Sequence, residues 1–156
     1  MRGTLIYSFS LFIIFLSSCK DGQDSIRVFP KGFEGHAIII FDEEKGKELV
    51  IEEGKRLYQF PESGVVISKA DENYGPQTHQ YFFETDKSER RGIAFISAFN
   101  YDAVNKSETK IAFHEIIVGK SGNRPAYKVF TIGKGKDIQK WIDSRNDFVE
   151  KVFENY

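Results

Sequence analysis

The chain has 156 residues and a formal net charge of −1, with 22 basic and 23 acidic side chains. A chain of this length is typical of a single domain. A protein so close to neutral lacks the basic surface that nucleic-acid binding normally requires, so no nucleic-acid partner is expected. Fifteen phenylalanines and seven tyrosines, together with many isoleucines and valines, favour a core built from β-sheets.

The N-terminus has the pattern of a bacterial lipoprotein signal. Arg2 precedes an apolar run over residues 5–16, which leads into Leu16-Ser17-Ser18-Cys19. The run is about a dozen residues, against roughly twenty needed to span a bilayer, so it fits the h-region of a signal peptide. A leucine, two small residues and a cysteine form a lipobox, where diacylglycerol is attached and the chain is cleaved. We predict a signal peptide over residues 1–18; the alternative is an ordinary signal with a chance cysteine.

Lipidation of Cys19 would decide where the mature protein sits. Cys19 is the only cysteine, so the mature chain would have no disulfide, cysteine metal ligand or cysteine nucleophile. Several acyl chains anchor a protein stably, so the expected partner is a membrane. Lys20 stands where aspartate would retain a lipoprotein in the inner membrane of enteric bacteria, which favours the outer membrane of a Gram-negative cell. The Lys20-Asp21 pair also resembles surface-export signals of Bacteroidota lipoproteins.

The rest of the chain reads as a short tether and one β-rich domain. Residues 19–25 are polar and contain Gly22, which predicts a flexible tether, and residues 26–156 form the domain. Residues 27–30 lead into eight runs of strand length, rich in β-branched and aromatic residues: 35–41, 48–51, 56–60, 65–67, 81–83, 93–99, 111–118 and 127–132. Turns recur every eight to twelve residues or so, a spacing typical of a sandwich or barrel.

Two turns in this series have a clear physical basis. Gly54 lies between residues 48–51 and 56–60, where it can adopt the positive φ of a tight hairpin. Pro61-Glu62-Ser63-Gly64 follows, with a proline that fixes φ at the first corner and a glycine that closes the turn. We therefore expect an antiparallel β-sandwich.

The C-terminal region changes to a helical period. Apolar residues recur on one stripe, which only Arg145 interrupts: Ile138, Trp141, Ile142, Phe148, Val149, Val152 and Phe153. This spacing predicts an amphipathic helix over residues 135–154, with Asp137 in the first turn, where a negative charge favours the helix dipole. We expect the helix to pack on the sheet; the alternative is that its apolar face docks a partner.

The chain resembles a domain family of unknown function found in small bacterial secreted proteins and lipoproteins. The resemblance rests on four segments: Phe29-Pro30-Lys31-Gly32-Phe33-Glu34-Gly35, Tyr58-Gln59-Phe60-Pro61-Glu62-Ser63-Gly64, Tyr81-Phe82-Phe83 and Ile132-Gly133. A strand, a glycine turn, a strand and then Pro-x-Ser-Gly also resemble, more weakly, the transthyretin-like or peptidase-regulatory sandwich. Neither resemblance implies an activity or a catalytic residue.

The sequence has few residues arranged for chemistry. The histidines His36, His79 and His114 are far apart and lack the local spacing of metal ligands. His36 and His114 lie in apolar runs, where a structural role is expected, whereas His79 lies in a loop. No nucleophile elbow, phosphate loop, HExxH or EF-hand pattern is present. We therefore expect no metal, no cofactor and no enzymatic activity, although a triad assembled in space stays an alternative.

The function expected from these features is a non-catalytic binding or interaction module of the cell envelope, with an envelope protein or glycan as partner. An assembly accessory of an envelope complex is the first alternative, and a hydrolase the second. The longest loops, residues 70–79 and 100–110, contain Tyr74, His79 and Tyr101. Such amphipathic side chains bind sugars or peptides at low entropic cost, so we expect these three to line one end of the domain; alternatively, they are ordinary surface residues.

Overall fold

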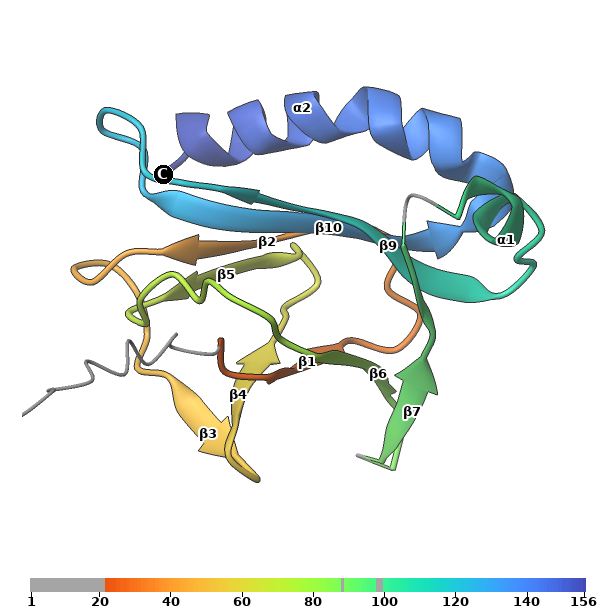
Figure 1. The fold of residues 1–156 in the computed structure, drawn as a ribbon, viewed down its shortest axis with the longest axis horizontal. Helices are drawn as coiled ribbons and strands as arrows, with labels where there is room; N and C mark the ends of the chain where they lie inside the picture. The colour runs from red at the N-terminus through yellow and green to blue at the C-terminus, as the bar shows by residue number, and fades with distance from the viewer. Residues whose placement is uncertain (1–21, 88, 98–99) are drawn as a thin grey trace, which may run out of the picture.

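The structure is a computed structural model that describes residues 22–87, 89–97 and 100–156, apart from the side chains of Tyr101 and His114 (Figure 1). The expected signal peptide and Cys19 lie outside these residues. Two sheets pack face to face, and one long helix lies across the outer face of the second sheet (Figure 1). In the described part of the chain, no helix is long and apolar enough to cross a membrane.

Each sheet has five strands. Sheet A has the order β3-β4-β1-β6-β7 and contains β1 (Ser25–Phe29), β3 (Val50–Glu52), β4 (Lys55–Gln59), β6 (His79–Glu84) and β7 (Arg90–Ile93). Sheet B has the order β5-β2-β10-β9-β8 and contains β2 (Gly35–Phe41), β5 (Val65–Ser68), β8 (Phe95–Ile96), β9 (Lys110–Val118) and β10 (Ala126–Lys134). The expected β-sandwich with a C-terminal helix is therefore confirmed.

The sheets are mixed rather than antiparallel throughout, which corrects one part of the expectation. Strand β1 is parallel to both β4 and β6, β2 is parallel to β5, and β8 is parallel to β9. The reason is that the chain alternates between sheets: β1 lies in sheet A, β2 in B, β4 in A, β5 in B and β6 in A. The parallel neighbours β1–β4, β1–β6 and β2–β5 are therefore joined by connections that pass through the other sheet, and β8 and β9 are joined through α1 (Tyr101–Asn105).

Strand β2 explains why the core has two layers. Ala37, Ile39 and Phe41 face sheet A and belong to a cluster with aromatic residues of both sheets, whereas Ile38 and Ile40 face the helix. A strand covered on both faces must be apolar at consecutive positions, and this accounts for the unbroken run from Ala37 to Phe41. In the layer between the sheets, the rings of Phe29 and Phe60 stack with centroids 4.6 Å apart.

Three helical segments complete the fold: α1 (Tyr101–Asn105), η1 (Gly135–Asp137) and α2 (Ile138–Glu154). The expected C-terminal helix is confirmed, and Val149 and Ile138 on its stripe are buried. Helix α1 lies where a loop was expected; Asn100 caps it by accepting a hydrogen bond from the Ala103 backbone N–H at 3.2 Å. A short helix with one capping side chain carries too weak a periodic signal to be found from sequence.

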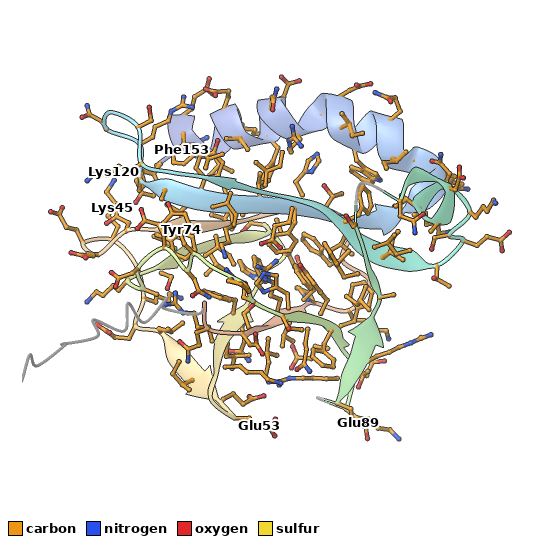
Figure 2. The ribbon with its side chains drawn as sticks, in the orientation of Figure 1. Lys45, Glu53, Tyr74, Glu89, Lys120 and Phe153 are labelled. Carbon is orange, nitrogen blue, oxygen red and sulfur yellow. The ribbon has the colours of Figure 1, made fainter. Side chains whose placement is uncertain are left out.

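Sheet A is strongly curved. Arg90 on the edge strand β7 bonds Glu52 on the opposite edge strand β3 through both guanidinium nitrogens. The edges of a flat five-stranded sheet would lie about 19 Å apart, so this contact requires the sheet to curl. Figure 2 shows the result: the tips of the two hairpins, labelled Glu53 and Glu89, project from the same side of the molecule.

Candidate functional site

A buried ion pair joins the two sheets. Arg27 of β1 is only 1% exposed, and its Nη1 donates to the Tyr81 hydroxyl at 2.7 Å and to Oε2 of Glu115 at 2.6 Å. Its Nη2 donates to Oε1 of Glu115 at 3.2 Å. The guanidinium also lies over the ring of Phe130, 4.5 Å from its centroid. A charge this deeply buried is tolerated only with several such partners, although the Nε of Arg27 has no hydrogen-bond partner among the described residues.

A β-bulge directs Glu115 into the space between the sheets. Thr131 of β10 pairs with Phe113 of β9, and Val129 pairs with Ile116. Two residues of β9, 114 and 115, therefore oppose the single residue Phe130. A bulge of this kind re-aims a side chain relative to the regular alternation of a strand. Burial opposes ionisation of Glu115, but the charge of Arg27 and the contact with His79 outweigh it and lower its pKa.

His79, the first residue of β6, connects this ion pair to a serine. Its Nδ1 lies 2.8 Å from the Ser25 hydroxyl, and its Nε2 lies 3.4 Å from Oε1 of Glu115. The neutral tautomer with its proton on Nε2 satisfies both contacts, because Ser25 then donates to Nδ1 and Nε2–H points at the carboxylate. Burial lowers the pKa of His79, against the raising effect of Glu115, and this favours the neutral form.

The Ser25–His79–Glu115 chain has the components of a hydrolytic triad: a hydroxyl, an imidazole and a carboxylate. Ser25 is nevertheless only 1% exposed, so a substrate does not reach its hydroxyl in this conformation. Both oxygens of Glu115 are also held by Arg27. In this conformation the hydrogen bonds and ion pairs of Ser25, His79, Glu115 and Arg27 hold the two sheets together.

Lys128 of β10 fixes the loop between β5 and β6. The residue is 2% exposed, and its ammonium donates to the Asn73 carbonyl at 3.0 Å and to Oε1 of Gln77 at 2.9 Å. Burial lowers the pKa of Lys128 to about 8. Asn73 also ties the start of the domain to this loop, since its Oδ1 accepts from the Gln23 backbone N–H at 2.8 Å.

A cleft of about 530 Å³ lies between β4 of sheet A and β5 of sheet B. Two of the segments that carry the chain from one sheet to the other border it: residues 42–49 lead from β2 to β3, and residues 60–64 lead from β4 to β5. The wall is mainly apolar and includes Leu49, Leu57, Tyr58, Phe60, Val66 and Ile67, with Lys45, Lys47 and Glu48 also lining it. Its size and lining are those of a small-molecule site.

A second apolar groove of about 500 Å³ lies on the other face of β5. It runs between Val65 and Ile67 of that strand and Phe148, Val152 and Tyr156 at the end of the chain. Among the described residues, no group of three or more His, Cys, Asp or Glu side chains could hold a metal ion.

The structure does not bring the three residues singled out from sequence to one end of the domain. Tyr74 is 54% exposed and lies beside Gly119, just after the C-terminal end of β9. Tyr101 begins α1, which precedes the other end of β9, and its side chain lies outside the described part. Figure 2 shows Tyr74 far from the position of α1 in Figure 1. His79 is directed inward to Ser25 and Glu115.

The remaining histidines fit the structural role expected of them where they are described. His36 is buried, with Nδ1 at 2.9 Å from the Thr131 hydroxyl and Nε2 at 3.0 Å from the Ser144 hydroxyl. The side chain of His114 lies outside the described part of the chain. Sequence reasoning missed the inward-facing charges Arg27, Glu115 and Lys128. The signal that could have found them is a charged residue inside an otherwise apolar strand.

Comparison with known proteins identifies the family of this domain. A model of a family of unknown function (DUF6843) matches residues 21–126. The chain belongs to this family. The matched residues include the Pro30–Gly35 and Pro61–Gly64 segments, so the resemblance inferred from them is confirmed.

One solved structure has a similar fold. It is a crystal structure of a Bacillus anthracis protein provisionally described as a lipoprotein, with a TM-score of 0.50 and 14% sequence identity. The similarity covers 70% of this chain and 69% of that chain. Among curated proteins, none matches this DUF6843 member.

Proposed function

We propose that this protein is a non-catalytic binding module of the bacterial cell envelope, anchored by lipid on Cys19. The observation that carries the proposal is the cleft between β4 and β5, which offers a concave and mainly apolar surface with charged groups at its mouth. The lipobox pattern and the lipoprotein description of the Bacillus anthracis neighbour support the anchor. Lys20 after the anchor favours the outer membrane of a Gram-negative cell.

Replacing Cys19 with alanine should abolish lipidation and leave an uncleaved or soluble precursor, because the acyl chains are the membrane anchor. The measurement is membrane fractionation, combined with the intact mass of the N-terminal peptide. A matched Ser18→Ala change keeps a small residue in the lipobox and should preserve the anchor. An unmodified Cys19 in the mature wild-type protein would show that the anchor is absent.

The binding role can be tested with a photocrosslinking amino acid at Val50 in the membrane-anchored protein. Val50 lines the cleft and is exposed, so the probe should be tolerated. Ile117 is the matched control: it is also an exposed apolar strand residue, but it lies on β9, three strands from β5 in sheet B. Irradiation of cells should give a defined adduct of small mass at Val50 and none at Ile117. Equal or absent adducts at the two positions would contradict the proposal.

The same experiment separates the alternatives. An adduct with the mass of a whole protein at Val50 would favour an assembly accessory over a small-ligand module.

The Ser25–His79–Glu115 chain is the observation that favours a hydrolase. A serine-directed fluorophosphonate should leave Ser25 unlabelled, whereas labelling that is lost in Ser25→Ala would favour the hydrolase.

A further inference from the structure

We propose that the cleft between β4 and β5 binds a single-chain amphipathic carboxylate, such as a fatty acid, with its acyl chain between the sheets and its carboxylate at Lys47. The inference rests on the proposed binding function and specifies its ligand. It draws on three features of the cleft: an apolar interior, a mouth with excess positive charge, and a rigidly placed lysine.

The interior of the cleft suits an acyl chain. Tyr58 and Phe60 are buried members of the core cluster between the sheets, and Leu49 and Val66 pack against that cluster. Leu57 also lines the cleft and is only partly buried. Because most of these lining residues belong to the core cluster or pack against it, an apolar chain in the cleft would remove exposed apolar surface from water.

The charges at the mouth favour an anion. Glu48 is paired with Lys69 at 2.8 Å, so its charge is compensated. The Lys45 ammonium donates to a main-chain oxygen of Tyr156 at 2.9 Å and lies near Asp42, whose pKa its charge helps to lower, so it is compensated as well. Lys47 is exposed, and no contact of its ammonium is observed among the described residues. Lys47 therefore leaves the mouth with one uncompensated positive charge, which is complementary to a negative head group.

Lys47 is held in place through its backbone. Its N–H donates to the Ile67 carbonyl at 3.0 Å, and its carbonyl accepts from the Lys69 N–H at 2.9 Å. Gly46 packs so closely on β5 that an added Cβ would lie 2.3 Å from the Lys69 nitrogen. Among the described residues, the cleft lining contains no arginine, and Lys47 supplies a single, compact positive charge. One such charge balances a singly charged carboxylate more closely than a doubly charged phosphate.

The test uses the lipidated full chain in nanodiscs and two photoreactive probes, a diazirine-bearing dodecanoate and the matching dodecanol. The yield of labelled peptide is measured for residues 47–68. Dodecanoate should label these residues, and Lys47→Glu should lower the yield about tenfold, because the change replaces an attractive charge at the mouth with a repulsive one. Lys106→Glu is the matched control: Lys106 is exposed beside α1, and its reversal should leave the yield unchanged.

The outcomes distinguish the ligand class from the binding function. Equal labelling by the alcohol and the acid, or no effect of Lys47→Glu, would overturn the carboxylate proposal. Absence of dodecanoate label in residues 47–68 would also overturn it. If the probe at Val50 still captures another small molecule, the binding function stands and only the ligand class is wrong. If it captures nothing, the binding function and the ligand class are both contradicted.

Discussion

Replacing Glu115 with glutamine should lower the free energy of unfolding by about 3–5 kcal/mol, because it leaves Arg27 buried without a counter-charge. Arg27 is 1% exposed and bonds Glu115 through two nitrogens, so water cannot replace the lost carboxylate. Denaturant unfolding followed by circular dichroism gives the change. A double variant, Arg27→Met with Glu115→Leu, should recover much of the loss, since a buried ion pair is often replaceable by apolar residues.

Glu150→Gln is the matched control for this substitution. Glu150 also pairs with both terminal nitrogens of an arginine, Arg124, but the pair is on the surface. Exposed pairs contribute little, so unfolding should be almost unchanged. Equal midpoints for Glu115→Gln and the wild type would contradict the role given to the buried pair.

The Arg27–Glu115 pair also makes stability depend on pH. The pKa of Glu115 is lowered from its ordinary value of 4.5, so its contribution is present above that value and is lost as the pH falls below it. The acid side of the stability profile should therefore be shallower in Glu115→Gln than in the wild type.

Trp141→Ala should cost about 3 kcal/mol, at the lower end of the range for removing a core tryptophan because the residue is only partly buried. Trp141 packs with the cluster of Val104, Ile111, Phe113 and Ile138. Its ring meets His36 edge-on at 5.7 Å, and its Nε1 lies so close to Gly133 that an added Cβ would be 2.6 Å away.

Two further variants separate packing from hydrogen bonding at this position. The buried Nε1 of Trp141 has no hydrogen-bond partner, so Trp141→Phe removes an unsatisfied donor and should cost much less than Trp141→Ala. Asn146→Ala, at an exposed position of α2, should be close to neutral. Native tryptophan emission should be blue-shifted. Red-shifted, quencher-accessible emission would mean that the helix stripe is free for a partner.

The sequence predicted the elements whose signal is local. The β3–β4 hairpin follows from Gly54, which has a φ of 76°, and α2 follows from its apolar stripe. The double burial of β2 is visible as an unbroken apolar run. Strand β1 lies at the centre of sheet A, but the sequence indicates it only as a lead into β2, because five residues carry little periodic signal.

The candidate site depends on long-range contacts that no local pattern encodes. Arg27 and Glu115 are 88 residues apart, and they meet only because of the bulge opposite Phe130. The apolar run over residues 93–99 predicts one strand, but its first residue, Ile93, ends β7 of sheet A and pairs with Tyr81, whereas Phe95 lies in β8 of sheet B and pairs with Ala112. The cleft likewise exists only because residues 42–49 and 60–64 cross between sheets.

Hydrogen–deuterium exchange of the anchored protein in nanodiscs, with and without dodecanoate, tests most directly whether the cleft is the binding site. The cleft and the groove beside α2 both border β5, so the measurement must distinguish binding in one from binding in the other. Slower exchange in residues 47–50 and 57–58, which line the cleft and not the groove, with residues 148–156 unchanged, is the result the cleft predicts. Protection confined to residues 148–156 would place the ligand in the groove beside α2 and contradict the account.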